Sequence, residues 1–597
     1  MLPEMLTLPV LRAALAAGAT PLDVINEVIA RRAALVARDL AVFISMTPDA
    51  ELRAQAQALT ERGPEGLPLY GIPFAVKDNI DAFGLSTTAA CPAFAYDPAA
   101  DAATVAKLRA AGAIVIGKTN LDQFATGLNG TRSPYGAPRS VFDPDYVSGG
   151  SSSGSAVAVA AGVCAFALGT DTAGSGRVPA MFNNIVGVKP TPGLVSNRGL
   201  VPACQSIDVI TVFAGTVADA VEVRRLMEGY DPADPFSRIS QPVPIPARPR
   251  IGVLTGAERN FYGNAEVAAL YDAACARAEA LGATLVPFDY APFREVAALL
   301  YDGPWVAERL AAVEGFLGTN AGDFDPVVRG IVEGAKGRTA VEAFRGLYRL
   351  NALRQQVAPV WQAVDMLMLP TAPTTATVAE MLADPVGRNS QFGLYTNFAN
   401  LLGYAAIAVP GGFGPSSLPA GVTLVGPGFS DDALAPFAGA MHHAAASGIG
   451  HALSAPVPPA PQAEIPADWL QIAVVGAHLT GMPLNHELTG PGGILVGTVK
   501  SAPGYRLYSL AGTVPPKPGM IFDPDATGPG LELEVWALPP AAFGRFVAAI
   551  PAPLGVGKVR LADGCSVTSF LCEAHALKGA EEITSFGGWR AWRASKA

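Results

Sequence analysis

Short hydrophobic runs alternate with amphipathic stretches along the first 440 residues of the chain. Four runs, each ended by a turn or a charged residue, are typical of buried strands: residues 72–76, 113–117, 366–369 and 406–409. Two stretches have the spacing of helices, residues 101–111 and 217–229. Alternation of this kind predicts an α/β fold with a largely buried sheet.

The longest apolar run, residues 156–169, consists mostly of Ala, Val and Gly. It is shorter than the roughly 20 residues that a membrane-spanning helix needs, and we expect a buried core helix there. The first residues carry an acid and no basic segment, so no signal peptide is expected. The chain is therefore predicted to be cytoplasmic, with no membrane partner.

A Pro-rich segment marks a change of character. Residues 452–468 (ALSAPVPPAPQAEIPAD) contain five prolines, which favours an extended connector between domains 1–451 and 469–597. Beyond it, β-rich segments are separated by Gly and Pro turns, followed by a helix-like stretch at 540–550; the segments are residues 472–475, 493–499, 505–510 and 531–538. This pattern predicts a small α+β, barrel-like domain.

Charge and cysteine usage narrow the class of protein. The formal net charge of −10 argues against nucleic-acid or anionic-membrane partners, which need clustered Lys and Arg. The six cysteines are scattered without CxxC spacing and are expected to be reduced thiols, not zinc ligands or disulfides.

Histidine placement removes one catalytic mechanism. All six histidines lie at or beyond position 442, so the first 441 residues cannot build a Ser-His-Asp site. If that region is hydrolytic, its base must be a Lys, a carboxylate or a metal-bound water, and no His/Cys cluster supports a metal.

Three segments then gain weight. GIPFAVKD (71–78) delivers Lys77 at a strand end, GGSSSGS (149–155) precedes the apolar run, and GTDTAGSGR (169–177) sets Ser175 in a Gly-lined turn. Singly, they are typical of a surface lysine, a flexible linker and a turn serine. Their order and spacing, however, resemble the amidase signature family from about residue 20 to 440. Further matches are GKTN (117–120), IVGVKP (185–190), LMLPTAP (367–373) and PAGVTLVGPG (419–428).

The resemblance implies a central mixed β-sheet flanked by helices and a Ser-Ser-Lys triad. Ser175 is then the nucleophile, Ser151 a bridging serine after a cis peptide bond, and Lys77 the base, which must be neutral to accept a proton. Backbone N–H groups of four residues would form the oxyanion hole: Thr172, Ala173, Gly174 and Ser175. Asp171 and Arg177 are expected to form a structural ion pair. No cofactor or metal is implied.

A second likeness concerns the substrate. LYDGPWVAERL (300–310) resembles the substrate-recognition helix of allophanate hydrolases, in which the residues matching Tyr301 and Arg309 contact a small anion. Pro304 suits the first turn of a helix, and a guanidinium can bind a carboxylate with two N–H groups. The alternative is that Arg309 pairs with an acid at the surface. LDQFATGLNGTRSPYG (121–136) is similar too, which implies that Gly127 lies at the rim of the site.

The C-terminal region also has a family likeness. VVGAHLTGMPLNHEL (474–488) and GYRLYSLAG (504–512) resemble the gamma-glutamyl cyclotransferase-like domain of allophanate hydrolases. By that resemblance His478 is catalytic and processes the first domain's product; the alternative is a structural hydrogen-bond donor. Glu532 and Glu534 share one face of a strand, where solvent exposure would explain both.

These resemblances predict hydrolysis of allophanate. The N-terminal domain would release ammonia through an acyl-enzyme, and the C-terminal domain would assist decarboxylation of N-carboxycarbamate. A separate urea carboxylase would be the functional partner, and a homodimer is implied. The alternative is a general amidase or a glutaminase-type component of an amidotransferase, with the C-terminal domain a non-catalytic binding or dimerisation module.

Overall fold

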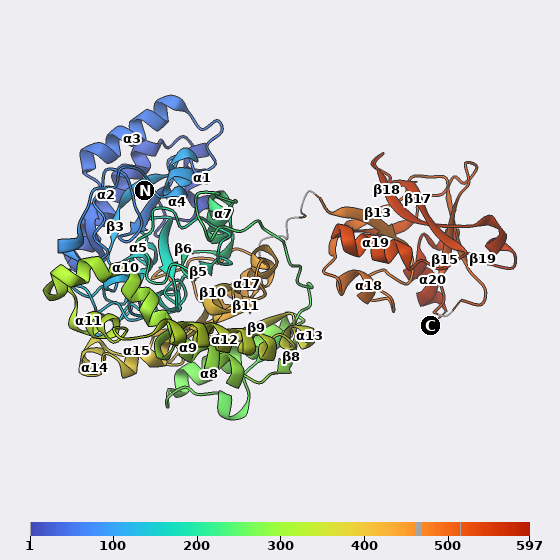
Figure 1. Ribbon diagram of the computed structural model, residues 1–597. Coiled ribbons are helices and arrows are strands. Elements are labelled where there is room, and N and C mark those ends of the chain that lie inside the picture. Colours follow the sequence, from blue (N-terminus) through green and yellow to red (C-terminus); the bar gives the residue numbers. More distant parts are fainter. Residues whose placement is uncertain (1, 460–464, 466–467, 514, 597) are drawn as a thin grey trace. The chain divides into compact units, whose positions relative to one another are not determined.

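The computed structural model describes residues 2–459, 465, 468–513 and 515–596. The described chain forms two compact units, one within residues 1–243 and 248–462, the other within 244–247 and 463–597 (Figure 1). The division falls inside the predicted connector 452–468, of which residues 460–464 and 466–467 lie outside the described residues. The sequence does not predict that residues 244–247 group with the second unit.

The first unit is built on an eleven-stranded sheet with the order β1-β3-β2-β4-β6-β5-β10-β11-β9-β7-β8. Its strands are β1 (Phe43–Met46), β2 (Pro73–Lys77), β3 (Ile114–Thr119), β4 (Phe166–Asp171), β5 (Val186–Lys189), β6 (Val209–Ala214), β7 (Arg250–Val253), β8 (Thr284–Pro287), β9 (Met366–Pro370), β10 (Ala405–Phe413) and β11 (Pro419–Gly426). β2 pairs in parallel with β3 and β4, whereas β4 and β6 are antiparallel, so the sheet is mixed. The four predicted strands are confirmed as β2, β3, β9 and β10.

Helices cover this sheet (Figure 1). They are α1 (Leu8–Ala16), α2 (Pro21–Arg38), α3 (Asp49–Arg62), α4 (Ala103–Ala110), α5 (Ser153–Ala160), α6 (Val178–Phe182), α7 (Val217–Met227), α8 (Ala265–Ala280), α9 (Ala291–Asp302), α10 (Trp305–Asn320), α11 (Pro326–Glu333), α12 (Ala340–Val357), α13 (Val360–Ala363), α14 (Val378–Ala383), α15 (Gly387–Phe392), α16 (Phe398–Leu401) and α17 (Asp431–Ala445). α4 and α7 confirm the two predicted helices.

The run 156–169 is not one helix, and that prediction was wrong. α5 ends at Ala160, and after Gly162, at φ +66°, the chain continues into β4. A left-handed residue ends a helix, and only glycine adopts that conformation without strain. The apolar composition reflects burial of two successive elements, since every residue of α5 and β4 is buried.

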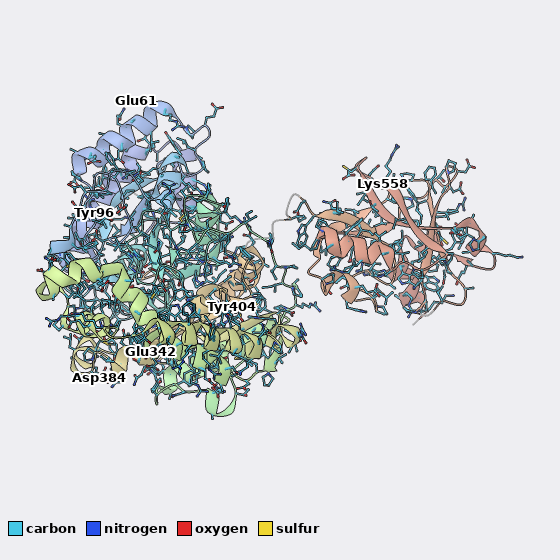
Figure 2. All side chains as sticks on the ribbon, viewed as in Figure 1. Glu61, Tyr96, Glu342, Asp384, Tyr404 and Lys558 are labelled. Carbon is cyan, nitrogen blue, oxygen red and sulfur yellow. The ribbon has the colours of Figure 1, made fainter. Side chains whose placement is uncertain are left out.

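The second unit contains a five-stranded sheet, β13-β16-β12-β18-β17, and a three-stranded sheet, β15-β14-β19. The strands are β12 (Leu470–Val474), β13 (Ile494–Lys500), β14 (Tyr505–Ser509), β15 (Pro518–Phe522), β16 (Glu532–Leu538), β17 (Leu554–Arg560), β18 (Ser566–Cys572) and β19 (Glu581–Glu582), and the helices are α18 (His486–Thr489), α19 (Pro540–Ala548) and α20 (Trp589–Ser595). Side chains fill the space between the elements of each unit, and Lys558 extends outward from β17 (Figure 2).

Two predictions about residue types can be compared with the structure. All six cysteines are free thiols, and only Cys565 is exposed. Glu534 was expected to be exposed, but it is buried: its side chain is 2% accessible and accepts hydrogen bonds from Thr480 and Arg590.

Among the helices of the described chain, none is both long and apolar enough to cross a membrane.

Candidate active site

The parallel pairing of β2 and β4 sets Lys77 beside Thr170. Val76 lies opposite Leu168, so the two strands end at the same edge of the sheet. Lys77 Nζ donates hydrogen bonds to Ser151 Oγ at 2.8 Å and to Thr170 Oγ1 at 2.6 Å, and the side chain is fully buried. Within the described chain the amine therefore donates to hydroxyl groups alone.

Burial changes the chemistry of this amine. It lowers the pKa of Lys77 to about 7, although the carboxylates of Asp122, Asp208 and Asp171 act in the opposite direction. A low-dielectric environment disfavours the charged ammonium. A substantial share of Lys77 is consequently neutral near pH 7, and a neutral amine can accept a proton from a hydroxyl.

Ser151 is held by the main chain of Asp122, a buried residue that the sequence analysis did not single out. The Gly150–Ser151 peptide bond is cis, as the resemblance implies. The N–H of Asp122 donates to Ser151 O at 3.1 Å, and the Asp122 carboxylate accepts the N–H groups of Gly130 and Arg132 at 3.0 Å each. Asp122 thus joins the loop carrying Ser151 to the loop that follows Gly127.

Ser175 lies in the turn between β4 and α6. Its Oγ donates to the Gly127 carbonyl at 3.3 Å, and no hydrogen bond to Ser151 is present among the described residues. Within the described chain, the N–H groups of Ala173, Gly174 and Ser175 likewise have no acceptor. N–H groups left free in one turn are what a developing oxyanion requires.

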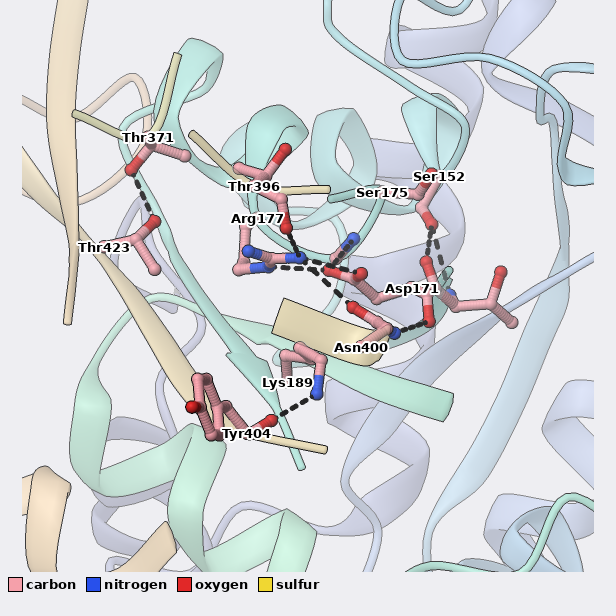
Figure 3. A network of polar contacts seen from close by, with 12 residues as sticks. Ser152, Asp171, Ser175, Arg177, Lys189, Thr371, Thr396, Asn400, Tyr404 and Thr423 are labelled. Atoms are coloured by element: carbon pink, nitrogen blue, oxygen red, sulfur yellow. Dashed lines mark hydrogen bonds and ion pairs between the residues drawn. The ribbon is translucent and has the colours of Figure 1, made fainter. Parts of the chain in front are cut away.

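An ion pair underlies the same turn. Arg177 Nε and Nη2 donate to the two Asp171 oxygens at 2.9 and 3.0 Å, and both side chains are fully buried, which confirms the predicted pair. Asp171 Oδ2 also accepts the Gly176 N–H, and Asn400 donates to the Asp171 carbonyl (Figure 3). Burial alone would raise the pKa of Asp171, but the Arg177 charge holds it below its usual value.

Arg309 is buried beside the loop that contains Thr126 and Gly127. It lies on α10, 2% exposed, and its Nη1 donates to Thr126 Oγ1 at 3.1 Å. Its guanidinium carbon is 5.3 Å from the ring centroid of Tyr301, which lies in the last turn of α9, so the predicted segment is a junction of two helices. Among the described residues, Arg309 Nε and Nη2 have no hydrogen-bond partner. The surface ion pair considered as an alternative is therefore absent from the described chain.

Thr126 and Gly127 connect these two regions. The Thr126 hydroxyl accepts a hydrogen bond from Arg309, and the carbonyl of the adjacent Gly127 accepts one from the Ser175 hydroxyl. The Arg309 guanidinium and the Ser175 hydroxyl therefore both bind the loop at Thr126 and Gly127. The arrangement can bind a small substrate with an anionic end at Arg309 and a carbonyl at Ser175.

Thr170 and Asp208 are further residues that sequence reasoning did not assign. Asp208 is fully buried and accepts Thr172 Oγ1 at 2.5 Å and the Ala203 N–H at 2.7 Å. Burial raises the pKa of Asp208 to about 6. Thr170 was visible in GTDTAGSGR, but only the pairing of β2 with β4 reveals its contact with Lys77. The described residues contain no group of His, Cys, Asp or Glu that could hold a metal ion.

His478 belongs to the second unit and follows β12. Its Nε2 lies 2.9 Å from Glu487 Oε2, and its ring stacks on Phe570 at 5.3 Å. Burial lowers the pKa of His478, although Glu487 acts in the opposite direction. The histidine lines a cavity of about 200 Å³.

Comparison with known proteins shows which family the chain belongs to. The amidase family model matches residues 23–435. The chain belongs to the amidase family. It is an amidohydrolase. The model of the allophanate hydrolase C-terminal domain matches residues 470–594; the likeness of this domain to gamma-glutamyl cyclotransferases remains a prediction.

Individual amidase relatives differ in how much of the chain they match. An allophanate hydrolase structure from Kluyveromyces lactis is 40% identical, with a TM-score of 0.89 and 99% coverage of both chains. The urea amidolyase of Lachancea kluyveri is 44% identical over 92% of this chain, which spans only 31% of that relative. One component of the glutamyl-tRNA(Gln) amidotransferase of Thermosynechococcus vestitus is 39% identical over 66% of this chain and 89% of its own length.

Proposed function

We propose that this amidase hydrolyses allophanate. The observation that carries the proposal is the buried Arg309 guanidinium, which lies over the Tyr301 ring and has two nitrogens without a partner among the described residues. Two parallel N–H groups match a carboxylate, and burial makes their attraction for an anion stronger than it would be in water. The match to allophanate hydrolase in structure and in the C-terminal family model supports this choice of anion.

In the proposed reaction Ser175 attacks the terminal amide carbonyl. Its proton passes through Ser151 to neutral Lys77 and then to the leaving nitrogen, so ammonia departs as the acyl-enzyme forms. The N–H groups of the 172–175 turn stabilise the oxyanion. Water then cleaves the acyl-enzyme and leaves N-carboxycarbamate. Because no Ser151–Ser175 hydrogen bond exists in the described chain, substrate must displace the Ser175 hydroxyl from Gly127 to complete the relay.

The second unit is proposed to assist loss of carbon dioxide from N-carboxycarbamate. One of its two carbon–nitrogen bonds breaks, the electron pair stays on nitrogen, the protonated form of His478 supplies the proton that nitrogen takes up, and carbamate remains. Carbamate takes up a further proton and breaks down to ammonia and carbon dioxide. Overall, allophanate, one water and one proton give two ammonia and two carbon dioxide. The enzyme would work as a cytoplasmic homodimer, and a urea carboxylase would supply allophanate, in keeping with the urea amidolyase relatives.

A glutaminase-type component of an amidotransferase is the second candidate, because the glutamyl-tRNA(Gln) amidotransferase relative matches the first unit at 39% identity. Ammonia release from allophanate, glutamine and simple amides separates the two. We expect turnover of allophanate alone. Turnover of glutamine without turnover of allophanate would reject the proposal.

In the full chain, His478→Ala should leave ammonia release from the first step intact and slow carbon dioxide release. Unchanged carbon dioxide release would make the second unit a binding or dimerisation module.

A further inference from the structure

The cavity in the second unit combines apolar walls with a lysine, Lys517, that has no ion pair among the described residues. Apolar side chains of α19, β17, β18 and the loops beside them form much of its surface: Leu484, Phe546, Ile550, Leu554 and Phe570. Three charged or titratable side chains reach the same cavity: His478, Glu487 and Lys517. Apolar walls lower the local dielectric, so a charge at their edge attracts a counter-ion more strongly than a surface charge does.

Two of the three groups are already engaged with each other. Glu487 Oε2 lies 2.9 Å from His478 Nε2, and the ring is fixed between Phe570, to which it is stacked, and Phe546, which it meets edge-on at 5.1 Å. A carboxylate on one ring nitrogen selects the tautomer and leaves the other nitrogen for a ligand. In the described chain, His478 Nδ1 has no hydrogen-bond partner.

Lys517 is the group without a counterpart. It immediately precedes β15, its side chain is half-buried, and no ion pair or hydrogen bond of its Nζ exists among the described residues. Pro518 holds it beside the histidine: a methyl group on Gly476 would overlap the Pro518 ring, so the loop leading to His478 passes directly against this point. Burial is the main cause that lowers the pKa of His478, and the Lys517 charge acts in the same direction.

Backbone donors complete the site. Gly476, Ala477 and His478 border the cavity, and across the described residues their N–H groups have no acceptor. Unpaired N–H groups of successive residues favour an anion. The cavity therefore offers the Lys517 charge, N–H groups and His478 Nδ1, all without a partner among the described residues. The Glu487 carboxylate, which also lines the cavity, contacts His478 Nε2.

We propose that Lys517 is the anion-binding residue of this cavity, which takes a small dicarboxylate with one carboxylate at Lys517 Nζ and its middle atom toward His478 Nδ1. The inference deepens the proposed function, on which it rests for the identity of the natural ligand. It assigns Glu487 as a positioning residue that acts through His478.

Malonate is a stable probe of this shape. The full-length chain is labelled with ¹³C at histidine Cε1, the His478 signal is assigned with His478→Ala, and malonate is titrated. We expect a saturable shift of the His478 signal, weakened at least tenfold in Lys517→Met and less than threefold in Lys517→Arg. Lys558→Met is the matched control, because Lys558 is an exposed lysine of the same unit that bonds only Thr568 in the described chain. It should bind malonate as the unaltered protein does.

The other five histidine signals report whether each variant keeps its fold. Lys517→Gln is the second variant if Lys517→Met alters them. A His478 signal that malonate does not move, or moves equally in Lys517→Met, overturns the inference. If malonate binds through Lys517 but allophanate is not hydrolysed, the proposed function fails while this binding site stands.

A functional readout adds an independent arm. With ¹³C-labelled allophanate, Lys517→Met should release the first ammonia at the unaltered rate and accumulate N-carboxycarbamate, seen by its carbon signal. Glu487→Gln should instead change the pH dependence of carbon dioxide release while malonate affinity stays within threefold. Loss of malonate binding in Glu487→Gln would contradict its role as a positioning residue.

Discussion

Arg177 and Asp171 form a two-point ion pair, wholly buried, at either side of the turn that carries Ser175. The pair fixes the two ends of the segment whose N–H groups are proposed to bind the oxyanion. Arg177 also donates to the Thr396 carbonyl, so the turn is tied to the segment before α16 (Figure 3).

Asp171→Asn should destabilise the protein strongly. It leaves the Arg177 charge buried without its partner, and removing one member of a buried pair costs about 3–5 kcal/mol. Urea unfolding of the full chain measures the loss. Asp272→Asn removes an exposed partner of Arg259 and should cost less than about 1 kcal/mol. Equal losses in the two variants would contradict a structural role for the buried pair.

Ser175→Ala should abolish ammonia release. A serine nucleophile that forms an acyl-enzyme has no substitute in the site, and we expect a decrease of at least about 10³-fold in kcat. Ser390→Ala, at an exposed serine that bonds only within its own helix, provides the control. A Ser175→Ala enzyme with more than a tenth of the original rate would exclude Ser175 as the nucleophile.

The pH profile should follow the titration of Lys77. With a pKa of about 7, the amine is mostly protonated at pH 6 and mostly neutral at pH 8, so kcat/KM should fall as the pH decreases through 7. The Asp122 charge raises the pKa of Lys77, so Asp122→Asn should move this limb to lower pH. A limb that moves to higher pH, or a profile flat from pH 5 to 8, would be inconsistent with a lysine base.

Arg309→Lys should impair binding more than chemistry. A lysine ammonium cannot present two N–H groups in one plane, and we expect KM for allophanate to rise at least tenfold with a smaller change in kcat. Arg294→Lys is a suitable comparison, because Arg294 pairs with Glu258 at the surface. An unchanged KM in Arg309→Lys would remove the guanidinium from substrate recognition.

Gly127→Ala should lower activity because no space exists for a methyl group there. The added carbon would overlap the Asp122 carboxylate, and the loop would have to move the carbonyl that receives Ser175. We expect at least a tenfold loss of kcat/KM. Gly315→Ala, on the open side of α10, should be neutral. Steady-state kinetics of the two variants test whether the loop position matters.

Much of the fold is readable from the sequence because it depends on local pattern. A short apolar run ended by Lys77 predicts a strand that delivers a lysine at its end, and β2 does so. The same reasoning failed for residues 156–169, where complete burial removes the periodicity that would separate a helix from a strand. Only Gly162, whose left-handed conformation ends the helix, signalled the change.

The site was less predictable because its contacts join distant segments. Burial of Arg309 depends on packing of α10 against the loop at Thr126, 183 positions earlier, and no local pattern encodes that contact. The partner of Asp122 is a set of backbone N–H groups, which any sequence supplies. Lys517 lines the same cavity as His478 only through tertiary folding of the second unit.

The pairing of β2 with β4 has a consequence for how such enzymes diversify. The spacing of Lys77 from Thr170 and from the Ser175 turn is fixed by main-chain hydrogen bonds between adjacent strands, not by the long stretch of chain that connects them. Parts of the connecting chain outside residues 120–132 can therefore lengthen, shorten or change composition across related enzymes without altering the spacing of Lys77 and Thr170. Such changes can alter the surroundings of the candidate site while Lys77 and Thr170 stay in register on their strands.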